Sequence, residues 1–224
     1  MPADVKHIYF KDRPALRAWL TQHHATHAAI WLVYDKGART ARTLSYDDIV
    51  EEALCFGWID SVAGRVSETQ SKLYFSPRKP RSVWSALNKR RITSLQQQGL
   101  ITAAGQAKID AAIADGSWTT LDAAEALELP ADLKRAFAQD AKARSNFNAF
   151  PPGARKQALT WIITAKRPET RALRITQTVQ LAAQNVRPNA QTAAALRTAS
   201  PPSKSRTPAR ASRPRTSRST RKAR

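Results

Sequence analysis

The N-terminal third of the chain alternates between strand-like and helix-like hydrophobic patterns. The apolar triplet at 8–10 predicts a short strand. Asp12 and Pro14 then predict the start of a helix, because aspartate caps helices and proline suits their first turn. A continuous apolar run at 28–34 is too short for a lone helix, so it predicts a buried strand.

A second helix is predicted between Ser45 and Gly57. Ser45 supplies the N-cap, Asp48 three residues later approximates a capping box, and Gly57 suits the helix end. Two strands are then predicted at 62–66 and 72–75, because a polar turn separates two runs that fit extended backbone.

The chain is expected to be helical after position 80. Ser82 is the predicted cap of a helix that ends at Gly99, and Thr102 is the cap of one that ends at Gly116. The apolar spacing gives each of these helices an inward face. Further helices are expected around 133–137 and 147–150, and from the prolines at 151–152 and 168.

These elements predict an α+β, helix-dominated protein. We expect one domain at 1–187, with a mixed α/β part at 8–78 that contains a small sheet, and a helical part at 82–185. From about Pro188 the apolar pattern stops, and the last 24 residues contain only Ser, Thr, Pro, Ala, Lys and Arg. Such a segment cannot recover its ordering entropy through burial, so we predict a disordered basic tail at 188–224.

The tail carries a disproportionate share of the positive charge. The formal net charge is +20, from 37 Lys and Arg against 17 Asp and Glu, and 11 of the basic residues follow position 185, where the sequence has no acidic residue. A chain of this kind attracts polyanions, so nucleic acid is a predicted partner, and a purely solubilising tail is the alternative. The candidate nucleic-acid-binding residues are Lys204, Arg206, Arg210, Arg213, Arg215, Arg218, Arg221, Lys222 and Arg224.

The number of cysteines and the length of the apolar runs limit the cellular compartment in which the protein is expected. The single cysteine excludes an intramolecular disulfide, which fits a reducing environment. The first residues lack the basic and apolar regions of a signal peptide, and no apolar run approaches the ~20 residues that cross a bilayer. We therefore expect a cytoplasmic protein without a transmembrane segment.

The basic segment that follows position 77 is the main candidate for a binding site. Pro77 and Pro80 stiffen a loop and are expected to hold Arg78, Lys79 and Arg81 outward. The predicted helix start beyond them, with further basic residues at 89–91, would favour a phosphate, a nucleic-acid backbone or an acidic protein surface. The alternative is a solvated loop followed by an ordinary basic helix.

Two tryptophans near this segment allow a second interpretation. Trp58 and Asp60 could line a pocket beside Trp84 and Asn88, with the carboxylate accepting hydrogen bonds from a ligand. The simpler interpretation places both tryptophans in the core, because aromatic residues at the ends of elements usually pack. The candidate ligand- or anion-binding set is Arg78, Lys79, Arg81, Trp84, Ser85, Asn88, Trp58 and Asp60.

No catalytic, cofactor or metal site is predicted. Cys55 lies near the C-terminal end of a helix, which disfavours a thiolate, so a buried inert thiol is expected. His23, His24 and His27 supply only part of a zinc site, and no Cys pair or second His pair completes it. Phosphate-binding loops and hydrolase motifs are absent from the sequence.

Several blocks of the sequence resemble the YdeI/OmpD-associated family, also described as bacteriocin-protection proteins. They keep the family's order across about residues 10–185. The blocks are Ala53 to Asp60 (ALCFGWID), Phe75 to Ser82 (FSPRKPRS), Trp84-Ser85 with Asn88, Thr102 to Gly105 (TAAG), Asp115 to Trp118 (DGSW) and Ala165 to Arg171 (AKRPETR).

The resemblance implies a role in bacterial stress and in survival of cationic antimicrobial peptides or bacteriocins, with a protein partner. It brings no catalytic residues with it. Our first hypothesis is therefore a non-enzymatic stress-protection protein that acts by binding an anionic or protein partner. The alternative is a nucleic-acid-associated protein that uses the tail and the basic surface from Arg78 to Arg91. An enzyme that uses Trp58, Asp60 and Asn88 on a small anionic substrate ranks third.

Overall fold

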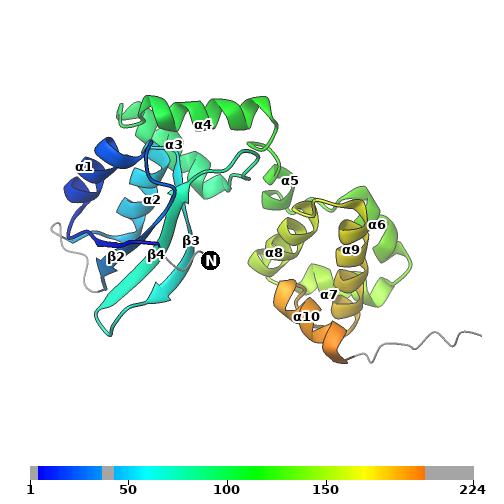
Figure 1. The fold of residues 1–224 in the computed structure, drawn as a ribbon. Coiled ribbons are helices and arrows are strands. Elements are labelled where there is room, and N and C mark those ends of the chain that lie inside the picture. The colour runs from blue at the N-terminus through cyan, green and yellow to red at the C-terminus, as the bar shows by residue number, and fades with distance from the viewer. Residues whose placement is uncertain (1–4, 37–42, 200–224) are drawn as a thin grey trace, which may run out of the picture.

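The computed structural model describes residues 5–36 and 43–199, and it confirms an α+β fold dominated by helices. Figure 1 shows the sheet with α1–α4 in one part of the molecule and α6–α10 in another, with α5 between them. The strands are β1 (His7–Tyr9), β2 (Ile30–Asp35), β3 (Trp58–Arg65) and β4 (Gln70–Pro77). The helices are α1 (Arg13–His23), α2 (Tyr46–Cys55), α3 (Ala86–Gln97), α4 (Ala103–Ala114), α5 (Asp122–Glu125), α6 (Ala131–Ala138), α7 (Ala141–Ala149), α8 (Pro152–Ile163), α9 (Pro168–Ala183) and α10 (Ala190–Ala199).

The four strands form one mixed sheet in the order β1-β2-β4-β3. β1 runs parallel to β2, whereas β4 runs antiparallel to both β2 and β3. The register shifts between Asp60 and Ala63, so β3 contains an irregularity in the middle of its pairing with β4. Both of the last two strands are longer than the sequence pattern predicted, since β3 begins at Trp58 and β4 continues to Pro77.

The first two helices begin where the sequence predicted. The Asp12 carboxylate accepts the amide of Ala15 at 2.9 Å, which caps α1. Ser45 and Asp48 form a complete capping box at the start of α2, because the side chain of each accepts the other's backbone amide. These reciprocal bonds satisfy amides that the first helical turn leaves unpaired.

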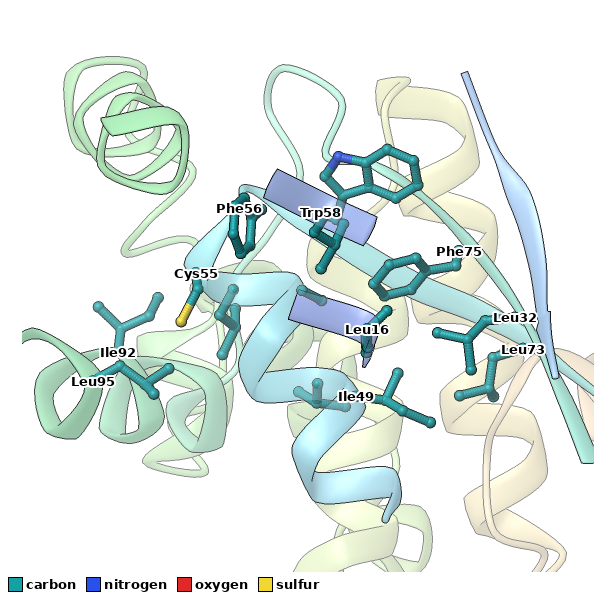
Figure 2. Packing of buried hydrophobic residues seen from close by; sticks show 14 of the residues in the cluster. Leu16, Leu32, Ile49, Cys55, Phe56, Trp58, Leu73, Phe75, Ile92 and Leu95 are labelled. Carbon is teal, nitrogen blue, oxygen red and sulfur yellow. The ribbon is translucent and has the colours of Figure 1, made fainter. Parts of the chain in front are cut away.

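The main core lies between the sheet and helices α1–α4. Leu16 of α1, Ile49 of α2 and Phe75 of β4 are completely buried, and Trp58 is 1% exposed. Figure 2 shows these side chains packed together alongside α2. The indole Nε1 of Trp58 donates to the carbonyl of His24 at 3.2 Å, so the ring's polar atom is satisfied inside the core.

A second core belongs to the C-terminal helices. Phe137 of α6 and Phe147 of α7 lie 5.1 Å apart between ring centroids, and Leu159 and Ile162 of α8 are fully buried in the same cluster. Short helix α5 connects this bundle to α3, because Glu125 accepts the Ala86 amide at 3.2 Å and also pairs with Lys156 of α8 at 3.1 Å.

The prediction of disorder from position 188 is wrong for the segment that forms α10. The side chain of Asn189 accepts the amides of Gln191 and Thr192, both at 2.9 Å, and so begins the helix. Ala193 is fully buried, and its carbonyl accepts from Gln177 of α9 at 3.4 Å. Alanine's high helix propensity and small size permit this packing in a segment with few large apolar residues. Residues 200–224, with all nine candidate tail cations, lie outside the described residues.

The predicted cap at Ser82 is also wrong. Helix α3 begins at Ala86, and the Ser85 hydroxyl caps it by accepting the Asn88 amide at 3.2 Å. The Ser82 hydroxyl instead donates to the carbonyl of Lys79 at 2.7 Å, which closes the loop after β4. Either serine suits an N-cap by sequence, and the loop's own hydrogen bonds decide between them.

Candidate anion-binding site

A tight loop follows β4 and shapes the basic segment. The Arg78 amide donates to the carbonyl of Gly57 at 2.9 Å, which ties the loop to the start of β3. The backbone of Arg81 has a positive φ of 59°, an uncommon conformation for a residue with a side chain. Its amide donates to the Asp115 carboxylate at 3.2 Å, so a contact with the end of α4 helps to hold this turn.

Arg78 points inward, contrary to the prediction that the prolines hold it outward. The residue is 3% exposed, and its guanidinium carbon lies 3.6 Å from the centroid of the Trp84 ring. Its Nη1 donates to the carbonyl of Val83 at 3.3 Å. The aromatic face and the carbonyl together provide a favourable environment for a buried cation, which a prediction based on loop stiffness did not include.

The guanidinium of Arg78 is incompletely satisfied. Its Nε is buried and has no hydrogen-bond partner among the residues that the structure describes. Burial lowers the pKa of Arg78 to about 10, and the negative charge of Asp60 partly opposes that shift. The side chain therefore remains charged at neutral pH with an unused donor, an arrangement that normally costs free energy.

A small pocket lies beside this guanidinium. Its volume is about 60 Å³, which is enough for a few water molecules or one small anionic group. The walls come from the loop after β4, from α4 and from the segment that follows α4. The lining residues are Arg78, Lys79, Pro80, Arg81, Ser82, Trp84, Lys108, Ala111, Ala112, Asp115 and Ser117.

The pocket has a strong excess of positive charge. Arg78, Lys79, Arg81 and Lys108 face a single carboxylate, Asp115. That carboxylate already accepts the backbone amides of Ser117 and Arg81, and the hydroxyl and amide of Ser117 lower its pKa. The four cations therefore have only one acidic neighbour in the lining, and the potential inside favours an anion.

Ser117 contributes a hydroxyl to the same wall. The residue is 5% exposed, and its Oγ is close enough to Asp115 to influence that carboxylate, yet it forms no hydrogen bond of acceptable geometry within the described residues. Two incompletely bonded polar atoms, Nε of Arg78 and Oγ of Ser117, thus belong to residues that line one pocket. Both groups can donate to an oxyanion.

The other cations of the predicted segment lie outside this pocket. Lys89 pairs with Asp122, and Arg91 pairs with Asp47 at 2.7 Å. These ion pairs join α3 to its neighbours and reduce the charge available to a ligand. Arg90 is exposed.

Trp58, Asp60 and Asn88, which were predicted to share a pocket with Trp84, do not line the Arg78 pocket. Trp58 belongs to the core, and the Asp60 carboxylate accepts the hydroxyl of Tyr46 at 2.9 Å. Asn88 lies in the first turn of α3, where its side-chain oxygen accepts from Arg91 at 3.4 Å. Of the eight candidate residues, the pocket contains Arg78, Lys79, Arg81 and Trp84.

Three lining residues had no signal in the sequence pattern. Lys108, Asp115 and Ser117 come from α4 and the turn after it, about thirty residues beyond the loop. Their role depends on how α4 packs, which local periodicity does not specify. Asp115 and Ser117 belong to the block DGSW at 115–118, one of those that resemble the YdeI/OmpD-associated family.

The cysteine and the two helix-face histidines that were considered for chemistry make packing contacts within the fold. Cys55 is fully buried, and burial raises the pKa of its thiol, as expected for an inert cysteine. The His27 ring contacts the rings of His23 and Trp19 edge-on, and the His23 ring meets Trp19 at a tilt. Within residues 5–36 and 43–199, no group of three or more His, Cys, Asp or Glu could hold a metal ion. In the same ranges, no helix is both long and apolar enough to span a membrane.

Comparison with known proteins divides the chain in two. Residues 8–108 match the family model of a domain of unknown function, DUF8412, which covers the sheet and the loop of the pocket. The blocks from Ala53 to Gly105 that we attributed to the YdeI/OmpD-associated family fall within this range. Neither the curated proteins nor the solved structures contain a significant match. The helical bundle at residues 126–185 matches a second model, that of the bacteriocin-protection, YdeI or OmpD-associated family.

Proposed function

We propose that the protein contributes to bacteriocin protection without catalysis, by binding an anionic group of a ligand or partner in the Arg78 pocket. The family of residues 126–185 supports the protective role. The pocket supports the mode of action, because it combines cationic side chains with the unused Nε donor of Arg78.

The unpaired Nε of Arg78 is the observation that carries this proposal. A buried guanidinium without a carboxylate partner is costly, and an arriving oxyanion would replace its lost hydration with charge-assisted hydrogen bonds. Several other arginines are paired with carboxylates instead. Arg171, for example, forms two bonds to Asp132, at 2.7 and 3.1 Å.

The sign of the charge bears on how protection would work. A cationic antimicrobial peptide would be repelled by the four cations of the pocket, and the chain's net charge of +20 acts in the same direction. Direct capture of such a peptide in this pocket is therefore disfavoured. We propose that protection proceeds through an anionic cellular ligand or an acidic partner surface.

A thermal-shift titration tests the binding step. Phosphate and sulfate, at constant ionic strength, should raise the melting temperature of the wild type more than chloride does. Arg78→Met should abolish this increment, whereas Arg90→Met, which changes an exposed arginine nearby, should keep it. An equal response of wild type and Arg78→Met would overturn the proposal.

A sensitivity assay tests the protective role. A deletion strain should be more sensitive to cationic peptides than its parent, and the wild-type gene should restore tolerance while Arg78→Met should not. A deletion strain as tolerant as its parent would count against protection.

Nucleic-acid binding by the tail stays a prediction, favoured by nine cations and no acidic residue in 201–224. The structure gives a better truncation point than position 187, because α10 extends to Ala199. Loss of affinity and of salt dependence on truncation after Ala199 would assign polyanion binding to the tail.

A further inference from the structure

A second, larger hollow adjoins the Arg78 pocket. Its volume is about 400 Å³, and its apolar walls are Ile59 of β3 with Tyr74 and Pro77 of β4. Lys79 and Ser82 line this hollow and the Arg78 pocket alike, so the two spaces are neighbours on either side of the loop after β4. The hollow alone falls within the volume range of small-molecule sites.

The hollow lies on the face of the sheet that points away from the main core. Along β4, Leu73 and Phe75 are buried in that core, so the intervening Tyr74 points to the opposite side and remains partly exposed. Trp31 of β2 contacts the Tyr74 ring edge-on, with 5.4 Å between centroids. The Nζ of Lys72 sits 4.4 Å from the Trp31 ring centroid, which adds positive charge to this face.

The lining combines three kinds of group. Tyr74, Ile59 and Pro77 offer apolar contact to a planar ring, Ser61 and Ser76 offer hydroxyls, and Lys79 stands on the side of the Arg78 pocket. A ligand that satisfies all three has a flat aromatic part, several hydroxyls and an anionic end.

We propose that the Arg78 pocket and this Tyr74 hollow together bind one nucleoside phosphate, with the phosphate in the pocket and the base against Tyr74. The proposal rests on the proposed function, because it names the ligand whose anionic group the pocket receives. The sugar would lie near the hydroxyls of Ser82 and Ser76.

The charge of the pocket favours phosphate over carboxylate as the anionic end. Four cations and one carboxylate line about 60 Å³, an excess that suits a doubly charged group. A guanidinium and a hydroxyl donate well to phosphate oxygens, and Arg78 with Ser117 supplies both.

The wall of the hollow favours a nucleobase over an alkyl chain. The Ser61 hydroxyl already donates to the Tyr74 carbonyl at 3.5 Å. The Ser76 hydroxyl would be left facing hydrocarbon, whereas a base and its sugar present polar edges to it. Stacking of a base on an aromatic side chain strengthens binding by about 10-fold or more. The same chemistry occurs in a free nucleotide and in the terminal nucleotide of a single strand.

Calorimetric titration of the full chain distinguishes a nucleoside phosphate from a simple phosphate ligand, and a free nucleotide from the end of a single strand. The probes are adenosine monophosphate, ribose 5-phosphate, inorganic phosphate and a short single-stranded oligonucleotide with a terminal phosphate. Adenosine monophosphate should bind about 10-fold more tightly than ribose 5-phosphate. Both carry the same phosphate, so attraction to the C-terminal cations cancels in the ratio.

Two tyrosine variants locate the contribution of the base. Tyr74→Leu keeps an apolar side chain but removes the ring, and it should reduce affinity for adenosine monophosphate to that for ribose 5-phosphate. Tyr9→Leu is the matched control, because Tyr9 lies on edge strand β1 and outside the hollow. It should leave the ratio unchanged.

The outcomes distinguish this inference from the function on which it rests. Equal binding of adenosine monophosphate and ribose 5-phosphate by the wild type overturns the nucleoside assignment, and so does a ratio that survives Tyr74→Leu in a folded protein. Arg78-independent phosphate binding overturns the proposed function itself. Preference for the oligonucleotide, lost in Tyr74→Leu, identifies a strand end as the source, and equal affinity identifies the free nucleotide.

Discussion

The guanidinium of Arg78 stacks on the indole of Trp84, with 3.6 Å between the guanidinium carbon and the ring centroid. The ring stabilises the cation through its quadrupole and leaves the charge uncompensated by a carboxylate. Arg78 is thus held in place inside the protein while its electrostatic attraction for an outside anion persists. A carboxylate paired with Arg78 at this position would have neutralised its charge and removed that attraction.

Replacing Arg78 by methionine should not destabilise the folded protein in the absence of anions. Arg78→Met removes a buried, unpaired charge and keeps most of the apolar stem, so we expect a free energy of unfolding equal to or about 1 kcal/mol above that of the wild type. Urea denaturation in a buffer free of phosphate and sulfate measures this difference. A loss of more than about 3 kcal/mol would make Arg78 a structural residue instead.

Replacing Glu52 should strongly destabilise the N-terminal part. This carboxylate is 1% exposed and accepts from Arg13 at 2.7 Å and from Arg17 at 2.9 Å. Glu52→Gln leaves two arginines facing a neutral amide, and since both are about one-third exposed we expect a cost of about 2 kcal/mol. Glu68→Gln, at a carboxylate that is 93% exposed, should change stability by less than about 0.5 kcal/mol. Equal effects of the two substitutions in urea denaturation would contradict this interpretation.

The Asp132–Arg171 pair should make the helical bundle sensitive to acid. Hydrogen bonds from Arg171 lower the pKa of Asp132 below its ordinary value of 3.8, against the opposing effect of burial. A lowered folded-state pKa contributes stability that is present above the unfolded-state pKa and is lost as pH falls through the folded-state value.

Asp132→Asn should therefore be less stable than wild type at pH 7, by about 1 kcal/mol, and the difference should shrink below pH 4. Denaturant titrations at pH 7 and pH 3 measure both values. Glu128→Gln, at an exposed carboxylate, is the control. A difference that stays constant between the two pH values would show that the hydrogen bonds, rather than the charge, matter.

Two helical glycines should respond oppositely to alanine. A Cβ at Gly105 of α4 would lie 2.3 Å from the carbonyl oxygen of Cys55, so Gly105→Ala must displace α4 from the end of α2. We expect a loss of about 2 kcal/mol or more, despite alanine's higher helix propensity. Gly153 of α8 has open space at the same position, and Gly153→Ala should stabilise the protein by about 0.5 kcal/mol. Melting temperatures of the two variants should move in opposite directions.

Local signals predicted most of the elements because they depend on neighbours in the chain. Asp12, Ser45 and Thr102 each cap the helix that the sequence assigned to them. The error at Ser82 arose because Ser82 and Ser85, three residues apart, are equally suitable as the N-cap of α3 by sequence. The error at 188–199 arose because α9 supplies a partner surface that compensates for a segment with few large apolar side chains.

Four of the eight candidate residues line the pocket for a similar reason. Proximity in sequence brought Arg78, Lys79, Arg81 and Trp84 together, and the density of cations and aromatic rings there predicted binding. Their orientation was not predictable, because the inward turn of Arg78 depends on where the Trp84 ring lies. Lys108 and Ser117 joined the site only through the packing of α4.

The sequence by itself determined the fold class, the helix caps, the concentration of charge and the family resemblance, since these follow from composition and from contacts between near neighbours. Tertiary structure alone decided that Arg78 is buried without an ion pair to any described residue, that Trp58 belongs to the core, and that the pocket and the Tyr74 hollow share a wall. Each of these depends on residues far apart in the chain meeting across β3, β4 and α4. These tertiary contacts depend on how whole helices and strands pack, and no local sequence pattern encodes them.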